Sequence, residues 1–177
     1  MTATRYVGFL RAVNVGKRRV AMADLREAVA GLGYEDVSTY VNSGNVLFRT
    51  ADDPAGLEPA LEERLAGSFG FEVPTFVRSA AELVRVEGAK PFGEVAAGET
   101  HLVVFLREAL PGATARTVEA LSNAMDTLVA DGRHLHRHIR GKVLDSSLTP
   151  KDWKALGDEP STSRNATMLA KLVPRLA

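Results

Sequence analysis

The chain has 177 residues, contains no cysteine, and carries 22 Lys and Arg against 22 Asp and Glu, so its formal net charge at pH 7 is zero. This length predicts one domain or two small subdomains. Its 45% hydrophobic and 25% charged residues are typical of a globular protein. The missing cysteines exclude disulfides, thiol catalysis and cysteine-ligated metal sites. The balanced charge gives no overall attraction to DNA or anionic lipid.

No apolar run reaches the ~18 residues that a membrane-spanning helix needs. The first residues also do not have the apolar stretch of a signal peptide. We therefore expect a soluble cytoplasmic protein without a membrane partner. The sequence does not indicate the oligomeric state.

The first half of the chain predicts the element order β-α-β-β-α-β, which is the split βαβ arrangement of ferredoxin-like folds. Runs of apolar, β-branched and aromatic residues predict the strands, and apolar residues at helical spacing predict the helices. In the second helix, an apolar residue at every fourth position predicts a face buried in the core. The predicted strands are residues 6–10, 38–42, 45–50 and 73–78, and the predicted helices are residues 22–32 and 54–69.

The second half repeats this order loosely, after a short helix that ends near residue 87. Its predicted elements are a strand at 101–106, a helix that runs to Met125, two or three strands within 128–146, a helix that starts near Asp152, and a last helix at 164–173. Thr162 or Ser163 is expected to cap that last helix. Helices and strands are segregated as in α+β proteins.

A polar cluster follows the first predicted strand. Arg11 stands at the end of the strand, and Asn14, Gly16 and Lys17 follow in a loop that continues with Arg18 and Arg19. This is not a Walker A motif, which needs glycine at position 11 and Ser or Thr at position 18. An arginine at a strand end can hold a carboxylate or phosphate with two hydrogen bonds. The alternative is that Arg11 and Asn14 only tie the loop down.

Two further clusters have both a structural and a functional interpretation. The turn at residues 42–45 fits ordinary turn chemistry, but it also presents amides and a hydroxyl. Ser43 is not predicted as a nucleophile, because the G-x-S-x-G context is missing and no general base is assignable. Near the C-terminus, Arg164 and Asn165 are expected to open the last helix, and a helix N-terminus can bind an anion.

Three histidines, His134, His136 and His138, share one face of a predicted strand, because side chains alternate along a strand. Such a cluster binds zinc only with further ligands, for which Asp131 and Asp145 are the candidates. The alternative is a solvated strand face, and we predict no metal site. No catalytic constellation is recognisable, so we predict neither a catalytic residue nor a cofactor, and whether the protein is an enzyme stays open.

Several of these residues together resemble an uncharacterised bacterial family, domain of unknown function 1697. The resemblance is carried by Arg11-x-x-Asn14-Val15-Gly16, Met22-x-x-Leu25-Arg26, Leu32-Gly33, Thr39-Tyr40-Val41, Ser43-Gly44-Asn45-Val46, and Arg164-Asn165 with Lys171-Leu172. The chain departs from the family pattern at Ala12, where the family has glycine, at Asn42, where it has glutamine, and at residues 166–168, where it has Trp-Asn-Thr. The histidine triplet is not part of that pattern.

The resemblance implies an α+β fold of two similar ferredoxin-like subdomains, and it implies no established activity. With the element order, it predicts subdomains at residues 1–95 and 96–177, with mostly antiparallel sheets and helices packed on one face. It also groups the polar clusters into one candidate ligand-binding site. The predicted members are Arg11, Asn14, Gly16, Lys17, Ser43, Gly44, Asn45, Arg164 and Asn165.

Three hypotheses about function follow. The first is binding of a small anionic ligand of the phosphate or nucleotide class at these residues. The second is a single-stranded RNA-binding module that stacks bases on Phe9 or Tyr6 and on Phe48. Zero net charge and only 6% aromatic residues count against it. The third is a protein-interaction module without catalytic activity, which a large exposed apolar patch would favour.

Overall fold

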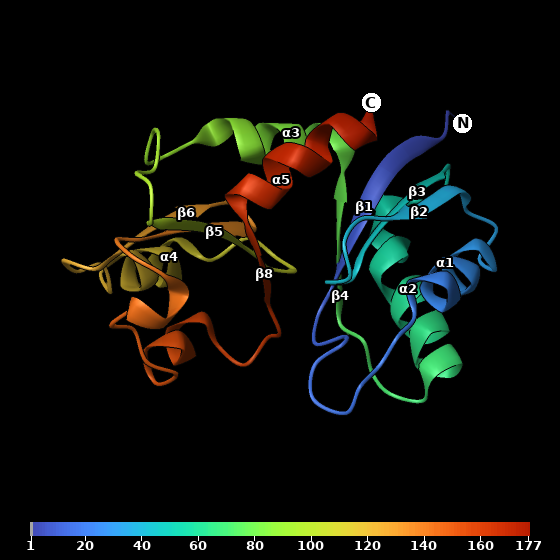
Figure 1. Cartoon of the computed structure of the whole chain (residues 1–177), viewed down its shortest axis with the longest axis horizontal. Coiled ribbons are helices and arrows are strands. Elements are labelled where there is room, and N and C mark those ends of the chain that lie inside the picture. Colours follow the sequence, from blue (N-terminus) through green and yellow to red (C-terminus); the bar gives the residue numbers. More distant parts are fainter. Residues whose placement is uncertain (1) are drawn as a thin grey trace. The chain divides into compact units, whose positions relative to one another are not determined.

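The computed structural model describes residues 2–177, which divide into two compact units. The first unit extends to Val84 and takes in Leu172–Ala177, and the second is Arg85–Lys171. Each unit contains one four-stranded sheet (Figure 1). None of the helices within residues 2–177 combines the length and apolarity needed to cross a membrane.

The first unit has the predicted ferredoxin-like topology. Its sheet has the order β2-β3-β1-β4, and every neighbouring pair is antiparallel. Both helices, α1 and α2, bury apolar side chains in the same core as Tyr6 and Phe48 of the sheet, so they cover one face. The elements are β1 (Thr4–Leu10), α1 (Met22–Ala30), β2 (Glu35–Thr39), β3 (Asn45–Thr50), α2 (Pro54–Phe69) and β4 (Thr75–Ser79).

Helix α2 forms where its local signals predict it. The Asp53 carboxylate accepts a hydrogen bond from the Ala55 N–H at 2.9 Å, and Pro54 occupies the first helical position. Gly70 ends the helix at φ 76°, a left-handed conformation that favours glycine. Between these ends, the apolar stripe packs against the sheet, and only its last residue, Phe69, is partly buried. Its buried members are Leu57, Leu61 and Leu65.

The second unit repeats the strand order of the first, with its sheet arranged as β6-β7-β5-β8 and every neighbouring pair antiparallel. Helix α3 (Ala80–Ala89) leads into it from β4. Its further elements are β5 (Thr100–Phe105), α4 (Gly112–Glu119), β6 (Asp126–Asp131), β7 (His134–Ile139), β8 (Thr162–Asn165) and α5 (Ala166–Leu172). The α+β class, with two antiparallel ferredoxin-like sheets, is confirmed.

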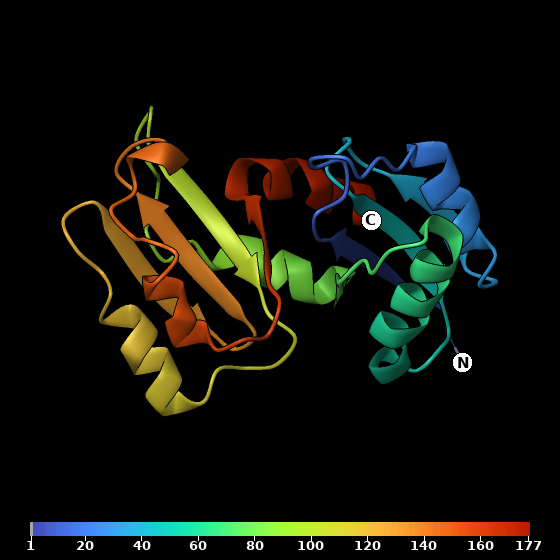
Figure 2. The ribbon, with the colours of Figure 1, turned by 90° about the horizontal axis from the view of Figure 1, so that it is seen from below.

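The second unit differs from the first between its last two strands. Where α2 joins β3 to β4, only two short 3-10 helices join β7 to β8: η1 (Val143–Asp145) and η2 (Asp152–Leu156). A third, η3 (Val173–Leu176), follows α5. Helix α4 and η2 contribute to the same apolar core and lie on the same side of the second sheet (Figure 2). This face therefore has less helical cover than its counterpart in the first unit.

Three predicted boundaries in the second unit are wrong, each because side chains or pairing override the local pattern. Helix α4 stops at Glu119 and not near Met125, because the Asn123 side-chain oxygen accepts the N–H groups of residues 125 and 126 and turns the chain into β6. Residues 162–165 are strand β8, paired with β5, and do not open a helix. Asn165, and neither Thr162 nor Ser163, caps α5, since its side-chain oxygen accepts the N–H of residue 167 at 2.9 Å.

Candidate functional site

Two loops of the first unit meet at one end of its sheet, and we call residues 11–20 and 40–45 the loop end. The Leu10 N–H donates to the Gly44 carbonyl at 2.8 Å, and the Asn14 amide donates to the Asn42 carbonyl at 3.1 Å. Gly44 has φ 78°, and a Cβ there would lie 2.5 Å from a Val13 methyl group. Only glycine fits this close approach of the two loops.

Two of the three asparagines of the loop end, Asn14 and Asn45, hold it together through their side chains. The Asn14 side-chain oxygen accepts the Val20 N–H at 2.8 Å, so this side chain bridges its own loop and the neighbouring one. Asn45 is completely buried, and its amide donates to the Tyr40 carbonyl at 2.8 Å and to the Ser43 hydroxyl at 3.0 Å. Both amides therefore act within the loop end and fix its shape.

The cations of the loop end are exposed. The side chains of Arg11 and Lys17 make no hydrogen bond or ion pair with any residue from 2 to 177. Arg18 lies over the Phe71 ring, with 5.0 Å from its guanidinium carbon to the ring centre, and Arg19 donates to the Arg18 carbonyl. Residues 11–23 and 37–45 contain no Asp or Glu. The charged side chains of the loop end itself are therefore all positive.

The structure places Arg164 and Asn165 in the second unit, whereas the other predicted site residues belong to the first. Arg164 lies on β8, is 8% exposed, and donates to the Thr162 hydroxyl and to the Ser163 carbonyl, both at 2.9 Å. Burial lowers the pKa of Arg164 to about 10. Asn165 is exposed and caps α5. A shared site for all the predicted residues stays a prediction.

The three histidines of β7 make separate contacts. His136 shares a hydrogen bond of 3.0 Å with His101 on β5, His138 contacts the Glu99 carboxylate at 2.7 Å, and His134 lies edge-on to a phenylalanine ring. Burial lowers the pKa of His101 to about 4, and it also lowers the pKa of His136, which an aspartate 3.8 Å away opposes. Within residues 2–177, no three His, Cys, Asp or Glu side chains form a group that could hold a metal ion.

The aromatic rings proposed for RNA binding are not accessible. Tyr6 is 6% exposed, and Phe9 and Phe48 are completely buried. Tyr6 and Tyr34 stack on Phe48 inside the core, with ring centres 5.8 and 4.9 Å apart. The prediction that these rings stack on bases is wrong, because all three rings are buried.

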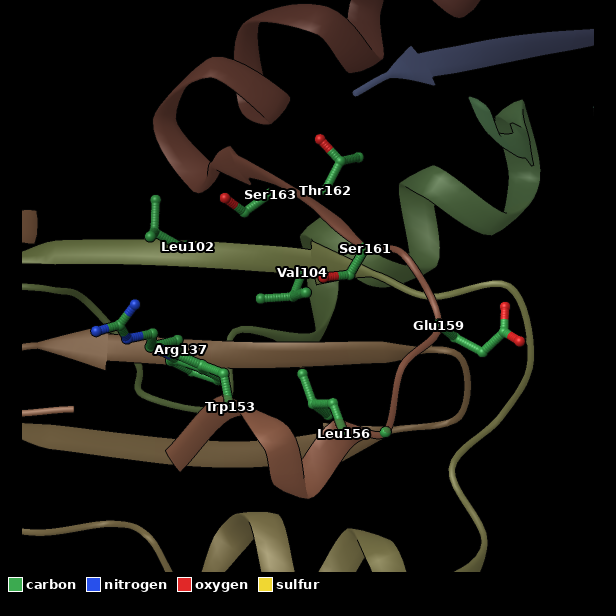
Figure 3. Close-up of a pocket in the computed structure, with 10 residues that line it drawn as sticks. Leu102, Val104, Arg137, Trp153, Leu156, Glu159, Ser161, Thr162 and Ser163 are labelled. Atoms are coloured by element: carbon green, nitrogen blue, oxygen red, sulfur yellow. The ribbon is translucent and has the colours of Figure 1, made fainter. Parts of the chain in front are cut away.

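A cleft of about 220 Å³ lies in the second unit, on the sheet face with little helical cover (Figure 3). Leu102 and Val104 of β5 and Arg137 of β7 lie along the sheet, and Trp153 and Leu156 of η2 form a wall. The segment that leads into β8 completes the lining. It contributes Gly157, Glu159, Ser161, Thr162 and Ser163.

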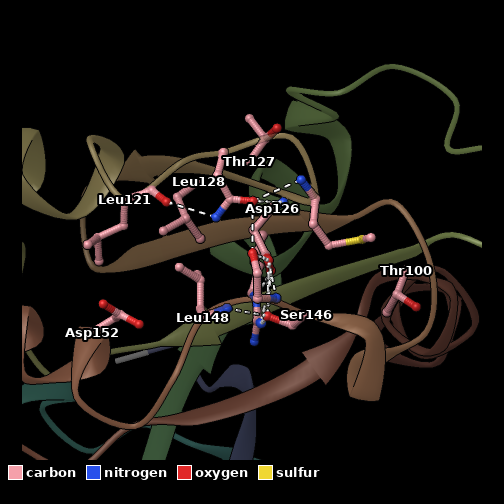
Figure 4. A network of polar contacts seen from close by, with 12 residues as sticks. Thr100, Leu121, Asp126, Thr127, Leu128, Ser146, Leu148 and Asp152 are labelled. Carbon is pink, nitrogen blue, oxygen red and sulfur yellow. Dashed lines mark hydrogen bonds and ion pairs between the residues drawn. The ribbon is translucent and has the colours of Figure 1, made fainter.

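A polar network around Asp126 and Ser146 (Figure 4) holds Arg137 at this cleft. Its Nε and Nη2 donate to the Asp126 carboxylate at 3.1 and 3.0 Å, and Nη2 also donates to the Ser146 hydroxyl. The hydroxyl of Ser146 and the N–H of Ser147 donate to the same carboxylate. Burial by itself would raise the pKa of Asp126, but these hydrogen bonds and the charge of Arg137 hold it below its ordinary value.

Sequence reasoning did not find Arg137 or its cleft. The available signal was the alternation of the strand, because Arg137 stands between His136 and His138 and must point to the opposite face. Trp153 is half-buried beside the cleft. The cleft itself had no local signal, since residues from three distant segments line it.

Comparison with known proteins decides the family. Residues 3–136, more than half of the chain, match the proteins of unknown function DUF1697. The chain belongs to this family. Among solved structures, a conserved bacterial protein of Streptococcus pneumoniae, SP0830, is similar over 99% of this chain and 100% of its own, with a TM-score of 0.77 and 28% sequence identity. No curated protein matches the chain.

The backbone gives a physical meaning to one departure of this DUF1697 chain from the family pattern. Ala12, where the family has glycine, adopts φ 56°. Asn14 and Val41 also have positive φ, of 57° and 52°. A left-handed conformation is unfavourable for residues with a Cβ, above all for β-branched valine. The loop end is therefore a strained structure that its hydrogen bonds maintain.

Proposed function

We propose that the loop end of the first unit binds a small anionic ligand of the phosphate or nucleotide class. The observation that carries the proposal is that Arg11 and Lys17 are exposed cations without a hydrogen-bond or ion-pair partner among residues 2–177. The loops that present them are tied together through Asn14 and Asn45. Binding therefore requires little ordering of the backbone, which lowers its entropic cost.

Two further features support an anion at this place. No carboxylate of residues 11–23 or 37–45 competes for the cations. Helix α1, which follows the first loop, begins at Ala21 without a side-chain cap, so its first N–H groups keep their capacity to donate. Hydrogen bonds from charged donors to an anion contribute about 1.5–3 kcal/mol each.

The proposal can be tested by thermal unfolding and by amide chemical shifts, with inorganic phosphate and ADP as probes at constant ionic strength. A ligand at ~100 times its dissociation constant stabilises the folded state by about 2.7 kcal/mol, which is a readily measured rise in Tm. We expect at least one probe to raise the Tm and to shift amides of the loop end.

The variants Arg11→Ala and Lys17→Ala are each expected to weaken binding of that probe about tenfold or more. Arg116→Ala is the matched control, because Arg116 is an exposed arginine of α4 in the other unit. Equal affinity in Arg11→Ala and the wild type would contradict the proposal, as would the absence of any shift with both probes. Whether Arg164 and Asn165 contact the same ligand can be read from their amide signals in the same titration.

A further inference from the structure

The cleft of the second unit exists because this unit lacks a counterpart of α2. In the first unit, the 16-residue helix α2 packs against β4, next to the central strand. In the second, η2 has only five residues and packs against α4, and its Trp153 and Leu156 form one wall of a cleft beside β5 and β8. Leu102 and Val104 therefore form the apolar floor of an open cleft of about 220 Å³.

Arg137 brings to this floor a charged donor that has no partner among residues 2–177. The residue is 9% exposed, and its guanidinium lies 4.8 Å from the Trp153 ring centre. Its Nε and Nη2 are occupied by Asp126 and Ser146, whereas Nη1 makes no hydrogen bond with any residue from 2 to 177. Charged N–H donors that are largely removed from water bind best to carboxylates and phosphates.

Other donors around the cleft are also without partners in the described chain. The hydroxyls of Ser161 and Ser163 and the indole N–H of Trp153 make no hydrogen bond within residues 2–177. The one carboxylate of the lining, Glu159, is exposed, and its side chain points away from Arg137 (Figure 3). The lining thus offers several donors beside an apolar floor.

We propose that this cleft binds a small organic monocarboxylate. Its carboxylate accepts hydrogen bonds from Arg137 Nη1 and from the serine hydroxyls, and its hydrocarbon part covers Leu102, Val104 and Leu156. The volume suits a molecule on the order of ten non-hydrogen atoms. Asp126 already neutralises Arg137, so the cleft offers hydrogen-bond donors without a net positive charge from this pair, and it disfavours a phosphate dianion more than a monoanion. This ligand and this site are separate from the anion proposed for the loop end.

The first experiment is a titration of the labelled protein with benzoate, benzamide and inorganic phosphate, followed by the Trp153 indole and the amides of residues 161–163. Benzoate is expected to shift these signals, and benzamide, which has the same shape without the charge, to bind at least tenfold more weakly. Equal binding of benzoate and benzamide would overturn the proposal. So would a benzoate titration that leaves these signals unchanged, or phosphate binding here more tightly than benzoate.

Arg137→Ala is not a suitable test, because it leaves the buried Asp126 carboxylate unpaired and endangers folding. Variants at other residues of the cleft test the binding site while the Arg137–Asp126 pair stays intact. Leu102→Phe fills the floor of the cleft, and we expect it to weaken benzoate binding at least tenfold. Ser163→Ala removes one hydroxyl, and we expect a loss of about threefold. Leu144→Phe is the control for the first variant, because Leu144 is 96% exposed and lies outside the cleft. If Leu102→Phe bound benzoate with the affinity of the wild type, the assignment of the binding site to this cleft would be overturned.

Discussion

The two units of the chain share one strand order and differ in the segment that joins their last two strands. In the first unit, α2 seals the sheet, and Leu57, Leu61 and Leu65 are completely buried. In the second, η1 and η2 replace it, and Trp153 and Leu156 are half-buried. A ferredoxin-like sheet therefore forms without its second long helix, and the uncovered face becomes a cleft.

One buried, ion-paired arginine in each unit, Arg78 and Arg137, takes its counter-charge from a different source. Arg78 on β4 is completely buried, with Glu58 of α2 at 3.6 Å and Glu82 of α3 at 3.4 Å. Arg137 on β7 pairs with Asp126 on the neighbouring strand β6. The counter-charges of Arg78 come from two helices, whereas that of Arg137 comes from the neighbouring strand, and Arg137 also lines the cleft.

The largest expected effect comes from breaking the pair in the second unit. Asp126→Asn removes the charge opposite the buried Arg137, and we expect the free energy of unfolding to fall by about 3–5 kcal/mol. Urea denaturation measures this change. The control in the first unit is Glu35→Gln at the exposed pair with Arg49, where about 0–1 kcal/mol is expected. Similar losses of stability in the two variants would contradict the conclusion that burial makes the Arg137–Asp126 pair more costly to break than an exposed pair.

A smaller effect compares the two connecting segments directly. Leu61→Ala in α2 empties a fully buried position and is expected to lower the free energy of unfolding by about 2–5 kcal/mol. Leu156→Ala in η2 removes a half-buried side chain beside the cleft, so about 1 kcal/mol is expected. Denaturant unfolding of Leu61→Ala and Leu156→Ala measures these two losses of stability. An equal loss would mean that η2 closes the cleft in solution.

Acid is expected to weaken the second unit before the first, because His101 and His136, whose pKa values burial lowers, both lie in the second. The pKa of His101 falls from 6.5 to about 4 in the folded protein, so the unfolded state binds protons first. This contribution to stability is complete above pH 6.5 and is lost as the pH falls toward 4. Hydrogen exchange at several pH values, corrected for intrinsic rates, should show β5 and β7 losing protection before β1 and β3.

His101→Gln is expected to flatten that dependence between pH 6.5 and 4. The measured loss should be modest, because His101 is partly exposed to solvent. A dependence that is unchanged in His101→Gln would show that other groups control the acid response of the second unit.

The smallest expected effect lies in the strained loop end of the first unit. Ala12→Gly relieves a left-handed backbone at φ 56°, and we expect a gain of about 0.5–1 kcal/mol in the free energy of unfolding. The matched control, Ala23→Gly, lies at an exposed position of α1 and should lose about 1 kcal/mol. Thermal unfolding of both variants should therefore give opposite shifts in Tm. A loss of stability in Ala12→Gly would contradict the conclusion that the backbone at Ala12 is strained.

Much of the first unit could be predicted because its signals are local. The Asp53-Pro54 start, the apolar stripe and Gly70 lie within one helix, and the turn at Ser43-Gly44 lies within one hairpin. The second unit was harder, because β8 contains polar residues with no strand pattern. It becomes a strand through pairing with β5, a partner about sixty residues earlier in the chain.

The candidate sites also divide into features with a local signal in the sequence and features that depend on the tertiary structure. Composition and local motifs were enough to name the α+β class and to single out Arg11, Asn14 and Lys17, since those signals are contained in short segments. Only the tertiary structure could show that the amide of Asn14 is used between loops, while Arg11 keeps its side chain unpaired. The Arg137 cleft is also a tertiary feature, because it forms where the second unit has two short 3-10 helices in place of a counterpart of α2.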